Sequence, residues 1–185
     1  MDGRARCAWC LKDQLYRDYH DKEWGVPSHD DQHLFEKLML ECFQAGLSWY
    51  TILKKRENFR KAFDGFNAKK ISKYTEEKVE GLMQDEGIIR YRAKILAAIS
   101  NAQKFLEIQK EFGSFDKFIW QFTDYKIIVN SMKSEKDFIV TSKESDAMCK
   151  ELKKRGFKFV GSTTCYAYMQ GVGMVNDHMN NCWRK

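Results

Sequence analysis

Hydrophobic residues recur at helical spacing through most of this chain of 185 residues. In the segment 30–45, Leu34, Leu38 and Glu41 point to similar sides of one predicted helix, which an aspartate at its start can cap. Glu41 is therefore a carboxylate beside an apolar helix face. Such a group needs a partner, which is either a structural group such as a backbone N–H or a molecule bound in a pocket.

The tripeptide Gly46-Leu47-Ser48 breaks this helix, and Ser48 can cap a second helix that begins at Trp49. Asn67 and Thr75 are predicted to cap two further helices. In the helix after Ser48, the residues expected to face inward are Trp49, Ile52, Leu53, Phe59 and Phe63, and those expected to face solvent are Lys54, Lys55 and Arg56.

The helix capped by Thr75 is predicted to end at Asp85-Glu86-Gly87. A long helix follows, with apolar positions at Ile95, Ile99, Ala102 and Leu106. The pattern therefore predicts two helices joined by a short glycine turn.

The rest of the chain is less regular. Residues 123–143 show no sustained period, which predicts an irregular excursion of the surface. A helix from about Ser145 ends at Gly156, which can form a left-handed C-cap, and a last helical region follows Val160. The predicted fold class is all-α, with residues 1–185 forming a single helical domain.

The composition is typical of a globular protein with a weakly basic surface. Hydrophobic residues make up 43% of the chain, and the net charge of +6 permits an anionic partner such as nucleic acid without requiring one. The first ten residues contain no apolar signal segment, and no stretch approaches the roughly 18 apolar residues that cross a bilayer. We therefore expect a cytoplasmic monomer with no membrane partner.

In a reducing compartment, the six cysteines indicate free thiols or metal ligands rather than disulfides. His178 and Cys182 are four residues apart, and on a helix such a pair projects from one face. Cys7 and His20 offer two further ligands, which completes a Cys₂His₂ set suited to structural zinc. Spacing leaves the choice open, because Cys10 competes with Cys7 and buried free cysteines account for the pattern equally well.

Aromatic residues are dense near the N-terminus, at Trp9, Tyr16, Tyr19 and Trp24, and Trp49 follows the glycine break. Each alone is more often a core residue. Together with the Glu41 carboxylate, they can stack on a flat, electron-poor ring and accept its amino hydrogens.

The segment Gly87-Ile88-Ile89-Arg90-Tyr91-Arg92-Ala93-Lys94 lies where the glycine turn leads into a helix N-terminus. The free backbone N–H groups and the dipole of such a terminus bind phosphate, as in a helix-hairpin-helix motif. An ordinary two-helix turn with solvated Arg and Lys side chains explains the segment equally well.

Seven blocks along the chain match one known family in content and order. They are residues 7–9, 16–27, 44–49, 53–57, 87–90, 153–161 and 176–178. With these blocks, the chain resembles the bacterial 3-methyladenine DNA glycosylase I family over nearly its whole length. The resemblance implies a helix-hairpin-helix DNA glycosylase fold whose N- and C-termini are stapled by one structural zinc ion.

The resemblance also implies roles for individual residues. The implied zinc ligands are Cys7, His20, His178 and Cys182, which leaves Cys10 without a family role. The implied base pocket is formed by Glu41, Tyr16, Tyr19, Trp49 and Trp9. The expected DNA contacts are Gly46 and Leu47 at the pocket mouth and Gly87, Ile88, Arg90 and Lys94 at the hairpin. Cys42 and Phe43 depart from the smaller or more polar family residues, so the detail of the pocket rim stays open.

The implied activity is excision of N3-methyladenine from alkylated double-stranded DNA, which leaves an abasic site and releases free 3-methyladenine; the extent of activity on 3-methylguanine stays open. The methylated base is cationic, so its glycosidic bond is already weak and recognition matters more than acid catalysis. The base must be flipped out of the duplex, with Gly46 and Leu47 filling the vacated stack. Glu41 serves the reaction by reading the base rather than by activating a nucleophile.

Related helix-hairpin-helix glycosylases carry a catalytic aspartate after the hairpin, and none of Glu107, Glu111 and Asp116 has a convincing context for that role. The family match places no lysine in the pocket, so we expect no Schiff base and no lyase activity. Two other functions stay open: a zinc-stapled DNA-binding module without catalysis, and a cytosolic enzyme acting on free nucleosides.

Overall fold

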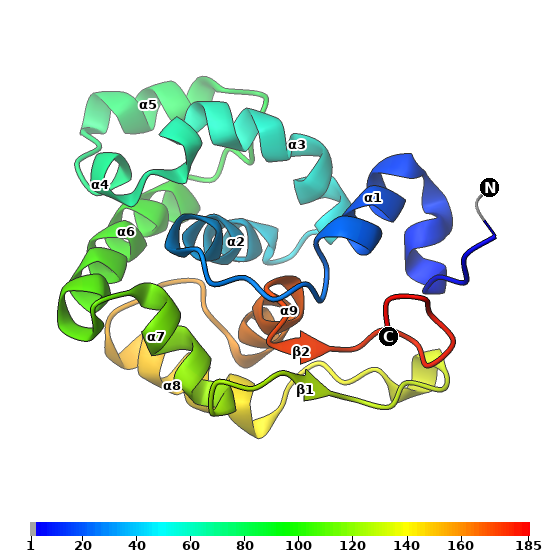
Figure 1. The fold of residues 1–185 in the computed structure, drawn as a ribbon. Coiled ribbons are helices and arrows are strands. Elements are labelled where there is room, and N and C mark those ends of the chain that lie inside the picture. The colour runs from blue at the N-terminus through cyan, green and yellow to red at the C-terminus, as the bar shows by residue number, and fades with distance from the viewer. Residues whose placement is uncertain (1–2) are drawn as a thin grey trace.

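The computed structural model describes residues 3–185, and α2 (Asp31–Gln44) lies at its centre. Figure 1 shows α2 surrounded by other helices, and it contacts α3, α6, α7 and α9. All residues of α2 from Leu34 to Phe43 are buried, including the charged Lys37 and Glu41. The helix is thus buried on nearly every side, and not only along the single apolar face that the sequence predicts.

The other helices and the strands follow in chain order. The helices are α1 (Gln14–Lys22), α3 (Trp49–Ala62), α4 (Ala68–Ile71), α5 (Glu76–Gln84), α6 (Arg92–Phe112), α7 (Phe115–Trp120), α8 (Lys143–Lys154) and α9 (Ser162–Gly171). The 3₁₀ helices are η1 (Ala8–Lys12), η2 (Asp64–Phe66), η3 (Gln121–Thr123) and η4 (Glu135–Asp137), and the strands are β1 (Ile128–Val129) and β2 (Val175–Asn176).

The predicted helix starts are confirmed by their caps. The side chains of Asp30, Ser48, Asn67 and Thr75 each accept a hydrogen bond from the backbone N–H three residues later. These bonds satisfy donors that the first turn of a helix otherwise leaves unpaired. After α8, Gly156 has φ +89°, so the predicted left-handed residue is also confirmed.

The segment 123–143 is largely irregular, as predicted, but it contains β1, which the sequence did not indicate. β1 pairs in parallel with β2, with Ile128 opposite Val175 and Val129 opposite Asn176. A strand of two residues has no period to detect, because only the pairing of distant segments defines it. Among residues 3–185, the mostly helical fold therefore carries a small two-stranded sheet beside α9 (Figure 1).

The chain after β2 corrects a second prediction. Residues 178–182 were expected to be helical, but they form turns, in which the Cys182 N–H donates to the Met179 carbonyl at 2.8 Å. The Trp183 N–H donates to the Ala5 carbonyl at 2.9 Å, which brings the two ends of the described chain together (Figure 1). No helix within residues 3–185 has the length and apolar character needed to cross a membrane.

Candidate functional site

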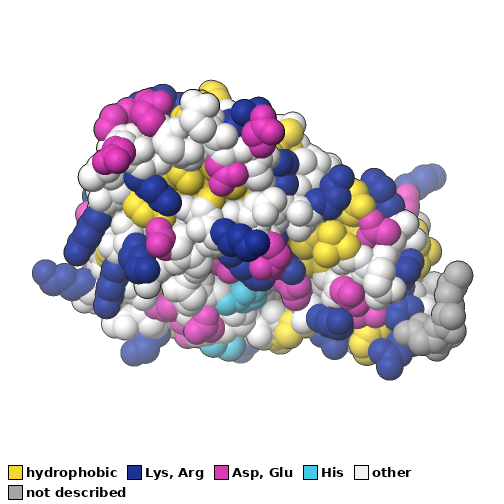
Figure 2. Space-filling view, turned by 90° about the horizontal axis from the view of Figure 1, so that it is seen from above, with side chains coloured by type: hydrophobic (Ala, Val, Ile, Leu, Met, Phe, Trp, Pro, Cys, Tyr) yellow, Lys and Arg dark blue, Asp and Glu magenta, His cyan; other side chains and the backbone are white. Residues whose placement is uncertain are grey.

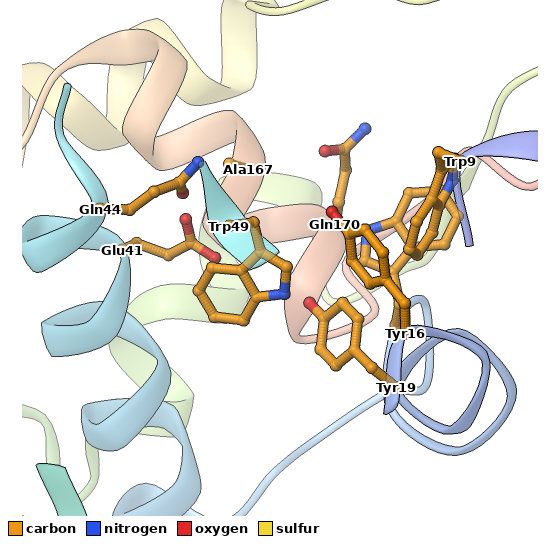
Figure 3. A pocket seen from close by; sticks show the side chains of 9 residues that line it. Trp9, Tyr16, Tyr19, Glu41, Gln44, Trp49, Ala167 and Gln170 are labelled. Carbon is orange, nitrogen blue, oxygen red and sulfur yellow. The ribbon is translucent and has the colours of Figure 1, made fainter. Parts of the chain in front are cut away.

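A cavity of about 200 Å³ lies between segments that are far apart in sequence (Figure 3). Its lining residues are Trp9 of η1, Tyr16 and Tyr19 of α1, Trp24, Glu41 and Gln44 of α2, Trp49 of α3, and Ala167 and Gln170 of α9. The five residues expected to form a base pocket are therefore brought together at one cavity.

The aromatic wall of this cavity is held by edge and tilted ring contacts. The ring of Trp9 meets the rings of Tyr16 and Trp24 with centroid distances of 4.9 and 5.1 Å, and Tyr19 meets Trp49 at 5.3 Å. Tyr16 and Tyr19 are three residues apart on α1, so they project from one face of that helix. Such rings offer flat apolar surface on which an aromatic ligand can stack.

Glu41 supplies the carboxylate of the cavity, and its residue is only 4% exposed. Burial raises the pKa of Glu41 above its ordinary value, because an apolar environment disfavours the charged form. The ammonium of Lys37, one helical turn earlier, opposes this shift at 4.0 Å from Oε1 of Glu41. Figure 3 shows the Glu41 carboxylate directed toward Trp49.

Lys37 lies next to the cavity but is not one of its lining residues. Its Nζ donates to the Tyr19 hydroxyl at 3.0 Å and lies 4.0 Å from the centre of the Trp49 ring. The residue is only 1% exposed, so its ammonium sits behind the cavity wall. The expected lack of Schiff-base chemistry stays a prediction, which the burial of this amine supports.

Gln170 presents a fixed amide to the cavity. Its Nε2 donates to Oδ2 of Asp177 at 2.7 Å, and the same carboxyl accepts from Tyr166 at 2.7 Å and Asn130 at 2.8 Å. A carboxylate only accepts hydrogen bonds, so the nitrogen of Gln170 must face it. The Gln170 oxygen is thereby left as an acceptor for a ligand.

Trp49, which lines the same cavity, carries an unsatisfied donor. Its buried Nε1 has no hydrogen-bond partner within residues 3–185, and a buried polar group without a partner costs about 1–3 kcal/mol. The cavity itself combines stacking surface, an acidic acceptor and an amide acceptor, which together suit a flat heterocycle with an exocyclic amino group.

The four predicted metal ligands meet beside this cavity. Cys7, His20, His178 and Cys182 are buried, and one ligand atom from each lies within 4.8 Å of the others. Three sulfur-to-nitrogen distances are 3.4, 3.6 and 3.7 Å. Zn–S and Zn–N bonds of about 2.3 and 2.0–2.1 Å at a tetrahedral angle place sulfur and nitrogen about 3.6 Å apart. The donor set therefore fits zinc, and Cys10, whose thiol instead donates to the Cys7 carbonyl at 3.1 Å, lies outside it.

The groups around the cluster orient its histidines. Nδ1 of His20 is 2.7 Å from the Asp21 carboxylate, and Nε2 of His178 is 3.1 Å from the Trp24 carbonyl, which leaves one ring nitrogen of each for a metal. Burial lowers the pKa of His178 to about 4, so the neutral, ligating form dominates near neutral pH. Gly25, with φ +75°, has no Cβ, and one would lie 2.9 Å from His178 Nε2.

Some of the residues expected to contact DNA, at the pocket mouth and at the hairpin, lie on the surface. Gly46 has φ +82° and open space around it, and Leu47 is 40% exposed in the α2–α3 loop. The half-exposed Arg90 lies between α5 and α6, 3.4 Å from Glu86. In Figure 2, Lys and Arg side chains alternate with Asp and Glu over the visible face, so net charge does not by itself locate a DNA surface.

Burial contradicts one of the predicted hairpin contacts and restricts another. Ile88 is 3% exposed and belongs to the core, so its predicted contact with DNA would be made by its backbone. Lys94 is 7% exposed, and its Nζ donates to the carbonyls of Phe43 and Ala45 at 2.8 and 2.7 Å. Its ammonium satisfies carbonyls at the end of α2 and is not available to a phosphate.

The structure also corrects predictions about three other residues. Cys42 and Phe43 do not border the cavity: both are buried in the core, and Phe43 packs against Phe59 at 4.8 Å between ring centroids. Arg56, expected to be solvated, pairs with Glu23 at 2.9 Å. In both cases the helix has a wider buried surface than its apolar stripe suggested.

Sequence reasoning missed three residues that line the cavity and one lysine behind its wall. Gln44 stands one helical turn after Glu41, so its position could have been inferred from helical geometry. Ala167 and Gln170 carry no local signal, because only the packing of α9 against α2 brings them to the cavity. Lys37 was missed because a lysine is normally assigned to solvent.

Comparisons with known proteins agree with this geometry. A family model described as methyladenine glycosylase matches residues 9–185. The chain belongs to the methyladenine glycosylase family. A DNA-3-methyladenine glycosylase of Haemophilus influenzae is 50% identical over 178 residues, 96% of each chain. DNA-3-methyladenine glycosylase 1 of Escherichia coli is 49% identical over 177 residues, 96% of this chain and 95% of its own.

Solved structures of this glycosylase family share the fold. One variant of 3-methyladenine DNA glycosylase I, solved in complex with 3-methyladenine, is 36% identical to this chain. It superimposes with a TM-score of 0.94 and covers 97% of each chain. The methyladenine glycosylase fold is therefore preserved here over nearly the whole length.

Proposed function

We propose that this glycosylase hydrolyses the N-glycosidic bond of N3-methyladenine in alkylated duplex DNA, as a monomer and without lyase activity. The observation that carries the proposal is the cavity in which Glu41, Trp49 and Tyr19 converge from three helices. Its aromatic walls suit a purine ring, and the carboxylate accepts hydrogen bonds from the amino group of the base.

The reaction needs little acid catalysis. N3-methyladenine in DNA is cationic, so the base leaves as a neutral molecule and needs no protonation. An ionised Glu41 stabilises positive charge on the base, and the cavity excludes normal bases by shape and hydrogen bonding. Water then completes the hydrolysis at the sugar.

The three acids that follow the hairpin, Glu107, Glu111 and Asp116, are engaged elsewhere. Glu107 pairs with Lys104, Glu111 with Arg155, and Asp116 with His29, and none of the three lines the cavity. This supports a mechanism in which recognition of a weakened bond replaces an aspartate that activates water.

The damaged base must be flipped out of the duplex to reach the cavity. The exposed Leu47 at the α2–α3 loop is the residue we assign to the vacated stack, and Gly46 before it lets the loop approach the strand closely. The α5–α6 connection, with Gly87 and Arg90, would hold the backbone as a helix-hairpin-helix motif.

Zinc in this proposal is structural. Cys7, His20, His178 and Cys182 would hold one ion, which would join the chain ends and supply no reacting group, because four protein ligands leave no open position. The cluster borders the cavity, since the His178 ring meets Trp24 at 4.6 Å.

The deciding experiment is chromatography of the products formed from methylated duplex DNA. Free 3-methyladenine and intact but abasic strands are expected, and 3-methylguanine release is scored in the same run. DNA binding without base release would favour a binding module instead. Release from free nucleosides but not from duplex would favour a nucleoside enzyme.

The hairpin gives a separate prediction. Arg90→Glu should weaken binding to damaged and undamaged duplex alike, because phosphate contacts carry no base information. The slope of log K against log salt should fall by roughly one to two units, as fewer counterions are released. Measurement is by fluorescence anisotropy over a salt series.

Lys110→Glu is the matched control, since it makes the same charge change near the other end of α6, roughly 27 Å along the helix from its start at Arg92. It should leave the salt slope within experimental scatter of the parent. Identical slopes for Arg90→Glu and the parent would show that the connection is only a turn.

A further inference from the structure

The buried Lys37 neither lines the cavity nor belongs to the Cys/His cluster. We infer that Lys37 is a positioning residue, which holds the Glu41 carboxylate in its ionised form and sets the Tyr19 hydroxyl as a hydrogen-bond donor toward the cavity. This inference rests on the proposed function of the cavity as the base pocket.

Lys37 touches three walls of the cavity from behind. Its Nζ is 4.0 Å from Oε1 of Glu41, 3.0 Å from the Tyr19 hydroxyl and 4.0 Å from the centre of the Trp49 ring. Glu41, Tyr19 and Trp49 all line the cavity, and Lys37 itself is 1% exposed. One ammonium therefore acts on the acceptor and two rings at once, without contact with a ligand.

The hydrogen bond to Tyr19 has a fixed direction. A protonated lysine carries three donors and no acceptor, so the Tyr19 oxygen must accept from Nζ. The hydroxyl hydrogen of Tyr19 then points away from Lys37 and is available to an acceptor in the cavity. Without the ammonium, this hydroxyl is free to turn and donate elsewhere.

Lys37 is also the cation that faces Glu41 directly. The other charged or titratable groups facing the pair are His33, Glu36 and Cys42 of α2, Tyr19 and Glu23 at α1, and Arg56 of α3. Glu23 and Arg56 pair with each other at 2.9 Å, and Glu36 pairs with Arg60 at 2.7 Å. In each of these pairs the two opposite charges neutralise each other. Lys37 is therefore the group that balances the charge of Glu41, which as an unpaired buried carboxylate would take up a proton.

The packing of α9 makes room for the ammonium. Gly171 has no side chain, and a Cβ there would lie 2.8 Å from Cε and 3.0 Å from Nζ of Lys37. The space beside Gly171 is thus filled by the end of the lysine side chain. A methyl group at this position would displace the ammonium without changing any charged residue.

The test is the affinity for free 3-methyladenine of the parent and Lys37→Met, titrated calorimetrically from about pH 5.5 to about pH 9. Methionine keeps most of the length of the unbranched side chain and removes the charge. Loss of the counter-charge raises the pKa of Glu41 further, so its carboxylate is lost at a higher pH as the solution is acidified. We expect roughly tenfold weaker binding near pH 6, which corresponds to a shift of about one pKa unit.

At about pH 9 the two proteins should agree within about threefold, because burial also lowers the pKa of Lys37 and the parent loses this charge there. The ratio of affinities at each pH cancels the titration of the ligand itself. Gly171→Ala, which displaces the ammonium, should shift the profile in the same direction if Lys37→Met does not fold.

Lys94→Met is the matched control, since it removes a buried lysine that bonds only to carbonyls near the end of α2. It should lower stability without moving the pH profile. The Glu41 titration can also be followed without ligand by ¹³C NMR of labelled glutamate carboxyls. A loss of affinity equal at every pH, with an unmoved Glu41 midpoint, would overturn the inference; a parent that does not bind 3-methyladenine would instead overturn the proposed function.

Discussion

Replacing Glu41 by Gln should lower kcat/KM for 3-methyladenine release by roughly ten- to a thousandfold. The amide keeps the shape of the side chain but loses the negative charge, and charge-assisted hydrogen bonds to the base are worth about 1.5–4 kcal/mol. One of the two acceptor oxygens also becomes a donor, which would oppose the amino group of adenine. Single-turnover release from methylated duplex measures the loss, and calorimetry should show weaker binding of the free base.

Glu36→Gln provides the matched control for this prediction. It makes the same chemical change on the same helix, but Glu36 pairs with Arg60 and does not line the cavity. Its effect should be confined to stability. Equal binding of the free base by the parent and by Glu41→Gln would show that Glu41 is a structural residue and that the base is held elsewhere.

The elements that were predicted well depend on local chemistry. Ser48 and Thr75 cap helices because a side-chain oxygen reaches an N–H three residues on, and this geometry is contained in a few consecutive residues. The same holds for the break at Gly46 and for Tyr16 and Tyr19 on one face of α1. Such features need no knowledge of the tertiary fold.

The predictions that failed depend on which segments meet. The sequence placed Lys94 in a phosphate site because it follows a glycine turn, yet its ammonium reaches the carbonyls at the end of α2. His178 and Cys182 were assigned to a helix by their spacing, whereas a turn brings their ligand atoms to 3.6 Å. A four-residue spacing fits both conformations, so the spacing identified the pair but not its backbone.

The cavity shows the same division. Its aromatic residues and Glu41 were identified from the N-terminal third of the chain, while Gln170 reaches it only through the packing of α9 on α2. The role of Lys37 could not be predicted either, because the sequence does not show that α2 is buried on nearly every side. A lysine on such a helix cannot reach water and must find partners inside the protein.

Metal analysis of protein purified without added zinc should find about one zinc ion per chain. His178→Ala should abolish binding and lower the free energy of unfolding by about 4 kcal/mol, the stabilisation that a ligand at a thousand times its dissociation constant provides. For a chain of this size, the melting temperature falls by roughly 8–16 °C. Base release measured well below that temperature should change far less than in Glu41→Gln, because the ion touches no reacting atom.

Cys10→Ser separates this metal effect from general damage to the N-terminal core. Cys10 is as buried as Cys7 and lies three residues away, but its thiol donates to the backbone carbonyl of Cys7 and is not one of the four ligand atoms. The variant should keep its zinc and lose about 1 kcal/mol or less from an altered hydrogen bond. A folded, active parent without zinc, or a His178→Ala variant with the zinc content of the parent, would exclude the four-ligand site. In that case the clustering of Cys7, His20, His178 and Cys182 would have to be explained by packing alone, although three buried sulfur-to-nitrogen distances of 3.4–3.7 Å match the edges of a zinc tetrahedron.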